Sequence, residues 1–235
     1  MYTGYRRRLD WDFLGIFDFN GTLLFDSDKH EKAWHIFIKE FCNKEISDEE
    51  FEKNIHGVVN KKALEYLYEK SLSTEEVLSL EQEKEKIYRR LVLEDTANFR
   101  LVPGAEELLD YICKENIPHT IATASEIVNL EFYIKSFSLE KWFDTEKIIY
   151  NDNTLPGKPD PAIYIKAAET IGVNPEDCLV FEDSKAGLTS AHNAGAGKII
   201  AVASTPEERE KAEKIHWISD IISNFYDFDM NILKK

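Results

Sequence analysis

The chain has 235 residues, of which 43% are hydrophobic and 31% charged, and its formal net charge is -15. This composition is typical of a folded globular chain and excludes intrinsic disorder, and the length predicts one core with a modest insertion. The negative charge excludes nucleic acid and anionic membranes as partners. A small phosphorylated molecule remains compatible, provided that a metal ion or a local positive group attracts it.

Targeting and redox signals are few. Arg6, Arg7 and Arg8 are not followed by an apolar run of signal-peptide length, and no stretch is long and apolar enough for a membrane span, so we expect a cytoplasmic protein. The three cysteines are far apart and lack metal-ligand spacing, which predicts free thiols rather than disulfides or a metal site.

The first apolar segment, Leu14 to Phe17, ends at Asp18, the pattern of a buried strand with a polar residue at its carboxyl end. Residues 26–98 then form a long, highly charged stretch with helical periodicity and no strand, which predicts an inserted helical module. Its helices are expected near 28–41, 61–70 and 74–93, with Thr74 as the N-cap of the last. Pro103 and Gly104 mark the return to the core.

Beyond that return, short apolar segments alternate with helical periodicity. Strands are predicted at 119–123, 147–150, 178–181 and 198–202, and helices at 104–115, 126–136, 161–171 and 185–194. This alternation predicts an α/β fold, a doubly wound parallel sheet with helices on both faces. We expect residues 1–25 and 99–235 to form this core and residues 26–98 a separate helical domain. The aromatic stretch 217–228 is expected to pack.

Ligands of open parallel sheets bind beyond the carboxyl ends of the strands, so polar residues there are candidate site residues. Inspecting these positions yields Asp18, Thr123, Lys158 and the pair Glu182 and Asp183. A carboxylate nucleophile, a hydroxyl, a lysine and an acidic metal site are the parts that phosphoryl transfer through an aspartyl-phosphate needs.

The residues Asp18-Phe19-Asn20-Gly21-Thr22, Thr123, Lys158-Pro159 and Glu182-Asp183-Ser184 stand in the order of four motifs of one family. Through these motifs the chain resembles the haloacid dehalogenase (HAD) superfamily over nearly its whole length. It is most similar to the beta-phosphoglucomutase-like branch, as the run from Phe181 to Gly187 indicates. The resemblance implies a Rossmann-like core with an inserted helical cap, and a Mg²⁺-dependent hydrolase that acts on a small phosphorylated metabolite.

The resemblance also implies roles for individual residues. Asp18 attacks phosphorus, Asn20 lies at the position of the catalytic acid and base, and Lys158 neutralises charge. Mg²⁺ is held by Asp18, the backbone carbonyl of Asn20, Asp183 and, directly or through water, Glu182. Phosphate or substrate contacts fall to Gly21, Thr123, Ala124, Ser125 and His30 of the first module helix.

Each motif also has an ordinary structural interpretation. Asn20-Gly21 between apolar runs is a strong hairpin signal, and the loop around Lys158 can be a solvated turn that opens a helix. Thr123 and Ser125 can cap the next helix, and His30 can face the module core. Two adjacent acids at the end of an apolar strand are harder to explain without a cation.

Two departures from the family pattern bear on activity. Asn20 stands where the family carries an aspartate that protonates the leaving group and activates water, and an amide cannot transfer that proton. Asn60 stands where true beta-phosphoglucomutases carry a phosphate-binding arginine, and it cannot form a bidentate phosphate contact. Three functions therefore stay open: a metabolite phosphatase, a sugar-phosphate mutase, and a catalytically weak phosphate-binding or regulatory protein.

Overall fold

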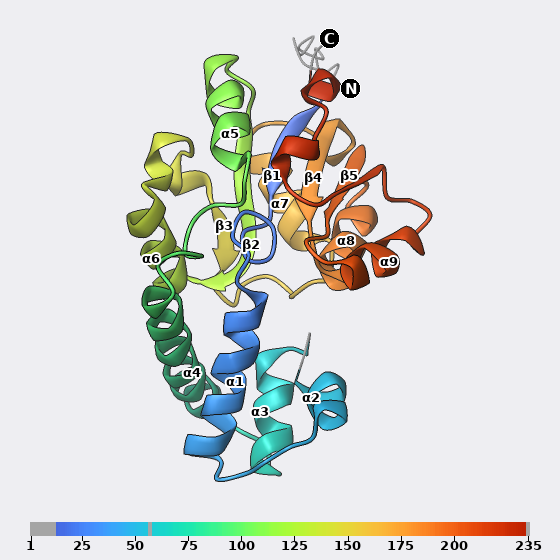
Figure 1. Ribbon diagram of the computed structural model, residues 1–235. Helices are drawn as coiled ribbons and strands as arrows, with labels where there is room; N and C mark the ends of the chain where they lie inside the picture. Colours follow the sequence, from blue (N-terminus) through green and yellow to red (C-terminus); the bar gives the residue numbers. More distant parts are fainter. Residues whose placement is uncertain (1–12, 56–57, 234–235) are drawn as a thin grey trace. The chain divides into compact units, whose positions relative to one another are not determined.

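The computed structural model describes residues 13–55 and 58–233, and its contacts divide the chain into two compact units. One unit combines the described residues of Met1–Leu23 and Leu101–Lys235, and the other is Leu24–Arg100. The first is an α/β unit, whereas the described part of the second contains only helices and loops (Figure 1). The boundaries expected from the sequence, residues 26 and 98, lie just inside the helical unit.

The α/β unit contains a parallel sheet with the strand order β3-β2-β1-β4-β5-β6. Its strands are β1 (Leu14–Phe17), β2 (His119–Glu126), β3 (Ile149–Asn151), β4 (Cys178–Glu182), β5 (Lys198–Val202) and β6 (Asp220–Ile222). All five strand pairings are parallel. The strand order reverses between β1 and β4, and in such sheets the ligand site lies beyond the carboxyl ends of the strands at that reversal.

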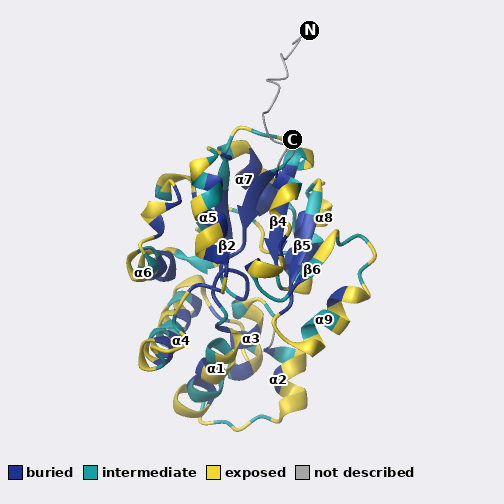
Figure 2. Ribbon diagram, turned by 45° about the horizontal axis from the view of Figure 1, so that its top comes forward, coloured by how far each residue is buried: buried dark blue, intermediate teal, exposed yellow. Residues whose placement is uncertain are grey.

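Side chains of the central strands alternate between the two faces of the sheet. Ile16 of β1 is in register with Val180 of β4, and both belong to the buried cluster on one face. Phe17 is in register with Phe181, and their rings stack with centroids 4.8 Å apart. Because both faces are apolar, β1 and β4 are buried along their length, and Figure 2 shows β4 in the colour of buried residues.

Helices cover both faces of this sheet (Figure 1). They are α5 (Ala105–Lys114), α6 (Ile127–Phe137), α7 (Ala162–Thr170), α8 (Lys185–Asn193) and α9 (Pro206–Glu213). Buried residues of α7, α8 and α9 complete the cluster that contains Ile16 and Val180. The predicted doubly wound α/β fold is thereby confirmed.

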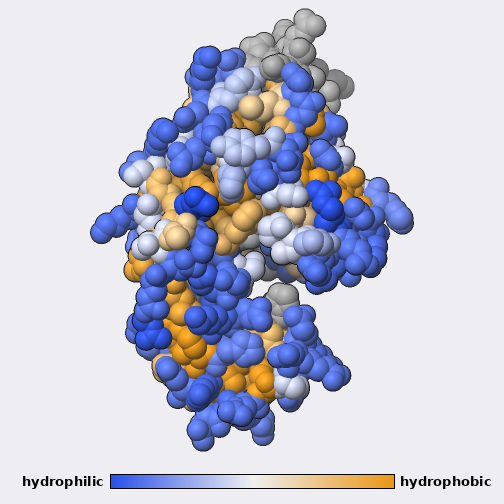
Figure 3. All heavy atoms as spheres, viewed as in Figure 1, coloured by the Kyte–Doolittle hydropathy of each residue, from blue (hydrophilic) through white to orange (hydrophobic). Residues whose placement is uncertain are grey.

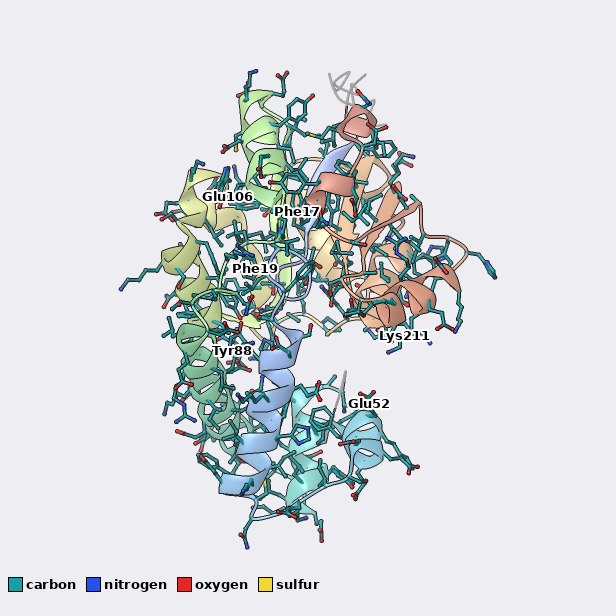
Figure 4. All side chains as sticks on the ribbon, in the orientation of Figure 1. Phe17, Phe19, Glu52, Tyr88, Glu106 and Lys211 are labelled. Atoms are coloured by element: carbon teal, nitrogen blue, oxygen red, sulfur yellow. The ribbon has the colours of Figure 1, made fainter. Side chains whose placement is uncertain are left out.

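The helical unit is built around one long helix. Its elements are α1 (Ser27–Phe41), α2 (Asp48–Asn54), α3 (Asn60–Tyr68) and α4 (Thr74–Glu94). Helix α4 contacts α1 and α3, and α2 contacts α3. Phe37 of α1, Leu64 of α3 and Tyr88 of α4 (labelled in Figure 4) are fully buried, so the unit has an apolar core of its own.

The N-cap of α4 is Ser73 and not Thr74, so the predicted cap was wrong by one residue. The Ser73 hydroxyl accepts a hydrogen bond from the Glu76 amide at 3.2 Å. The Glu76 carboxylate in turn accepts from the Ser73 amide at 2.8 Å. This reciprocal capping box requires a glutamate or glutamine three positions after the cap residue, and the residue three positions after Thr74 is Val77.

Two strand boundaries also differ from the prediction. Strand β2 continues to Glu126, because Glu126 pairs with Asn151 of β3 beyond an irregularity in the register. Lys147 belongs to a short 3-10 helix, Thr145–Lys147, and not to a strand. Asp144 explains this, since it accepts a hydrogen bond from the Glu146 amide and forms an ion pair with Lys147 at 2.9 Å.

Among the α-helices and strands of the described residues, α2, α9 and β6 were not predicted individually. Strand β6 lies inside the aromatic stretch 217–228, where Ile221 pairs with Ala201 of β5 at the edge of the sheet. Phe225 and Phe228 of this stretch are buried against Phe181, as expected for packing residues. The strand was missed because three residues are too few to show the alternation of apolar and polar residues that is typical of a strand.

The described helices include none with the apolar length that crossing a membrane requires. The visible faces of both units are mostly hydrophilic, consistent with the 31% of charged residues (Figure 3).

We expect Ser73→Ala to loosen the first turn of α4, while Thr74→Ala leaves it unchanged. Loss of an N-cap costs about 1 kcal/mol of helix stability. Hydrogen exchange of the Glu76 and Val77 amides measures the effect, and the exposed Thr74 is the matched control. Faster exchange in Thr74→Ala than in Ser73→Ala would contradict the capping box.

Candidate active site

Asp18 directly follows β1 and is only 6% exposed. Its backbone amide donates to the carbonyl of Phe181 in β4 at 3.0 Å, so the main chain still pairs with the sheet at this residue. Phe17 and Phe19 on either side are buried in the α/β unit (Figure 4). The carboxylate is therefore held by a rigid backbone, which suits a group that must meet a substrate in a defined orientation.

A tight turn follows Asp18. The amide of Leu23 donates to the carbonyl of Phe19 at 2.8 Å, and Gly21 adopts a positive φ of 79°. A Cβ on Gly21 would lie 2.1 Å from Oδ2 of Asp183, so only glycine fits both the conformation and the space. Residues 21–23 form a turn, and β1 pairs in parallel with β2 and β4, so the tight turn that Asn20-Gly21 indicates is present and lies in the loop after β1.

Lys158, in the loop between β3 and α7, lies between two carboxylates. Its Nζ donates to Oδ1 of Asp18 at 2.7 Å and also to Oε1 of Glu182. Burial disfavours the charged amine, but the attraction of Asp18 and Glu182 outweighs it, so the pKa of Lys158 lies well above its ordinary value. The lysine is a fixed positive charge on the predicted nucleophile, and the interpretation of a solvated turn was wrong for its side chain.

Asp18, Glu182 and Asp183 form a cluster that can hold a cation, with one oxygen from each within 4.8 Å of the others. Burial and the negative charges of Glu182 and Asp18 raise the pKa of Asp183 well above its ordinary value. Thr22 donates from Oγ1 to Oδ1 of Asp183 at 3.3 Å. Such mutual repulsion of buried carboxylates is relieved by a divalent cation, so the donor set fits a metal ion.

The predicted phosphate-binding residues lie at the end of β2. Thr123 is buried, and its Oγ1 accepts from the Ser125 amide at 3.1 Å, whereas Ala124 is exposed. The Ser125 hydroxyl donates to Oδ1 of Asn20 at 2.7 Å. Asn20 in turn donates from Nδ2 to the Tyr133 hydroxyl at 2.8 Å. The structure therefore brings Asn20 and Ser125 together, while the phosphate contacts stay a prediction.

His30 belongs to the helical unit. Its ring stacks on Tyr88 with centroids 3.9 Å apart, and Nδ1 accepts from Nζ of Lys84 at 2.7 Å. Lys84 is 3% exposed and forms an ion pair with Glu85 at 2.8 Å. The histidine thus takes part in a partly buried polar cluster of α1 and α4, and its role in substrate binding stays a prediction.

Sequence reasoning missed two tyrosines at the site. Tyr133 of α6 contacts Asn20, and Tyr164 of α7 donates to Oε1 of Glu182 at 3.1 Å. Burial, together with the charge of Glu182, raises the pKa of Tyr164 well above its ordinary value, which keeps the phenol protonated. Nothing in the sequence distinguishes either residue from an ordinary core aromatic, because both stand on the buried face of an amphipathic helix.

Residues 16–195 match a family model described as haloacid dehalogenase-like hydrolase. The chain belongs to the haloacid dehalogenase-like hydrolases. A crystal structure of an HAD hydrolase of family IA, variant 3, from Entamoeba histolytica is similar to it with a TM-score of 0.86 and 36% identity. That likeness covers 94% of this chain and 96% of the other.

Two curated HAD relatives show the range of activities in the family. The phosphorylated carbohydrates phosphatase of Thermotoga maritima is 30% identical, covering 80% of this chain and 83% of its own. The beta-phosphoglucomutase of Bacillus subtilis is 28% identical, covering 77% and 79%. The resemblance to the beta-phosphoglucomutase-like branch is confirmed, and the chain is a hydrolase or phosphotransferase of the HAD family.

We expect a divalent cation to stabilise the protein more as the pH rises. A raised pKa means that ionising Asp183 costs folding free energy, and this cost appears as the pH rises through the raised pKa. A bound cation offsets it, so the difference in unfolding temperature with and without excess MgCl2 should widen from acidic to neutral pH. Asp183→Asn should abolish the widening, and an equal widening in that variant would contradict the assignment.

Proposed function

We propose that this chain is a phosphatase of small phosphorylated carbohydrates or related metabolites, with Asp18 as the nucleophile. The observation that carries the proposal is the contact between Lys158 and Asp18, which places a buried positive charge 2.7 Å from the carboxylate at the end of β1. The relatives named as a carbohydrate phosphatase and a sugar-phosphate mutase support this substrate class.

The proposed reaction has two steps. An oxygen of Asp18 attacks phosphorus, an aspartyl-phosphate forms, and the alcohol leaves; water then attacks phosphorus, releasing phosphate and regenerating the carboxylate. Lys158 offsets part of the negative charge in both steps, where positioning and charge neutralisation supply most of the catalysis. The Thr123 hydroxyl and the amides of Gly21, Ala124 and Ser125 are proposed to hold the phosphoryl oxygens.

Mg²⁺ is the proposed cofactor. Asp18, the backbone carbonyl of Asn20 and Asp183 would hold it, with Glu182 in contact directly or through water. The three carboxylates lie close enough together, and the absence of a side chain at Gly21 lets the Asp183 carboxylate lie against the turn that follows Asp18. When bound, the ion would supply positive charge against the phosphoryl oxygens.

We further propose that the helical unit, Leu24–Arg100, serves as the cap that selects the substrate and excludes water. It has its own buried core, so it can move as one body. His30, whose side chain is 26% exposed, is the proposed substrate contact within it.

We expect Asp18→Asn to abolish both turnover and covalent phosphorylation, because the amide cannot act as the nucleophile. Magnesium-dependent phosphate release from a panel of sugar phosphates measures turnover, and mass spectrometry after acid quenching detects the aspartyl-phosphate. Asp152→Asn changes an exposed acid outside the site and is the control. Full activity in Asp18→Asn would refute the proposal.

A mutase is the second candidate, favoured by the likeness to the B. subtilis beta-phosphoglucomutase. Asn60 begins α3 and cannot supply a bidentate phosphate contact, which favours the phosphatase. The same panel separates the two, since a mutase converts one sugar phosphate into another without net release. Phosphate binding without either reaction would support the regulatory alternative.

We expect Asn20→Asp to raise turnover of alkyl phosphates on the order of 10²-fold, because a carboxylate restores general acid–base catalysis. The site accommodates it, since the hydroxyls of Ser125 and Tyr133 already contact both polar atoms of Asn20 and can donate to a carboxylate. Aryl and acyl phosphates should gain less in the first step, because their leaving groups need no proton.

Deamidation is the confounder of that experiment, because Asn20 precedes Gly21 and a converted fraction would carry aspartate. Mass spectrometry of the Asn20 peptide establishes that the wild-type protein is intact. If Asn20→Asp hydrolyses alkyl phosphates no faster than freshly prepared wild type, the missing-acid explanation is wrong.

A further inference from the structure

The carboxylate of Glu182 accepts hydrogen bonds on both oxygens although it is only 1% exposed. Oε1 accepts from the Tyr164 hydroxyl at 3.1 Å and from Lys158. Oε2 accepts from the amide of Ser184 at 2.8 Å and from its hydroxyl at 3.1 Å. A buried carboxylate with this many donors is locked in one orientation.

The start of helix α8 closes another side of this carboxylate. A Cβ on Gly187 would lie 1.7 Å from Oε1 and 2.3 Å from Oε2 of Glu182. The glycine therefore lets the carboxylate lie directly against the helix backbone. Any larger residue there would push Glu182 out of its position.

Tyr164 is anchored from the opposite side. It is 1% exposed, and it belongs to the apolar cluster that α7 and α8 form on the sheet. Nζ of Lys158 lies 5.1 Å from the centroid of its ring. The packed ring leaves the hydroxyl no freedom, so its hydrogen bond to Glu182 is fixed by the core of the unit.

Lys158 contacts two carboxylates, and the Tyr164 hydroxyl affects how strongly each of them attracts it. The Lys158 ammonium donates to Asp18 at 2.7 Å and to Glu182, and it also donates to the carbonyl of Ala122 at 3.5 Å. Without the Tyr164 hydroxyl, Oε1 of Glu182 loses a donor and attracts the ammonium more strongly. That attraction pulls Lys158 away from Asp18.

We propose that Tyr164 is a positioning residue whose hydroxyl, acting through Glu182, keeps the Lys158 ammonium on Asp18. Its effect on turnover rests on the phosphatase function proposed above, whereas its effect on Lys158 does not. Since Lys158 acts on charge that develops during transfer, displacing it lowers kcat more than it raises KM.

The direct test observes the Lys158 ammonium by 15N NMR of protein labelled at lysine Nζ. A buried, hydrogen-bonded ammonium exchanges slowly, so the wild type should show a protected signal that Lys158→Met removes. We expect Tyr164→Phe to shift or broaden it beyond detection. Thr120→Val is the matched control, because it removes another buried hydroxyl, which donates to the Lys147 carbonyl at 2.7 Å, at the other end of β2.

The kinetic arm uses the same variants. We expect Tyr164→Phe to lower kcat about tenfold and leave KM within about twofold, and Thr120→Val to change neither. Gly187→Ala displaces Glu182 independently of Tyr164 and should alter the Lys158 signal in the same way, which keeps the proposal testable if Tyr164→Phe folds poorly.

An unchanged Lys158 signal in a folded Tyr164→Phe would overturn the proposal, as would a wild-type spectrum without a protected signal. If Tyr164→Phe does not fold, an unchanged signal in Gly187→Ala would overturn it. If Tyr164→Phe alters the Lys158 signal but the wild-type protein has no phosphatase activity, the phosphatase function alone would be refuted. An equal loss of kcat in Thr120→Val would mean that removing any buried hydroxyl slows turnover, and this result would also overturn the proposal.

Discussion

The rest of the site depends on two ion pairs of Lys158, whose ammonium lies between the carboxylates of Asp18 and Glu182. The parallel pairing of β1 and β4 brings these two acids to the same end of the sheet, where they repel each other. Removing the charge between them would leave buried carboxylates uncompensated, at a cost of about 3–5 kcal/mol. The lysine therefore contributes to folding as well as to the chemistry proposed for the site.

The site also depends on what lies beneath it. Phe17 stacks on Phe181, so the two strands that present the acids are joined by an aromatic pair directly before their carboxyl ends. Gly21 and Gly187 lack the side chains that would collide with Asp183 and Glu182. A rigid apolar base and two glycines thus allow three acids to share a small volume. The pKa of Asp183 is raised by burial and then by repulsion from Glu182 and Asp18.

Membership in the HAD family sets the class of reaction but not the substrate. Relatives of comparable identity are named as a carbohydrate phosphatase and as a beta-phosphoglucomutase. Selectivity must then come from residues outside the HAD motifs. In this chain the candidate is His30 of the helical unit, whose Nδ1 accepts a hydrogen bond from Lys84 and whose ring stacks on Tyr88.

The sequence by itself determined the fold class, the family and the strand-end residues Asp18, Glu182 and Asp183, because an apolar run followed by an acid is a local pattern. It also placed the helices to within a residue or two, apart from α2 and α9. Only the tertiary structure decided the short edge strand β6, the charge partners of Lys158 and the hydrogen bonds of Tyr133 and Tyr164. Those contacts join residues as far apart as Asp18 and Lys158, 140 positions in sequence. No periodicity or spacing encodes which buried aromatic will turn its hydroxyl toward a polar group of the site.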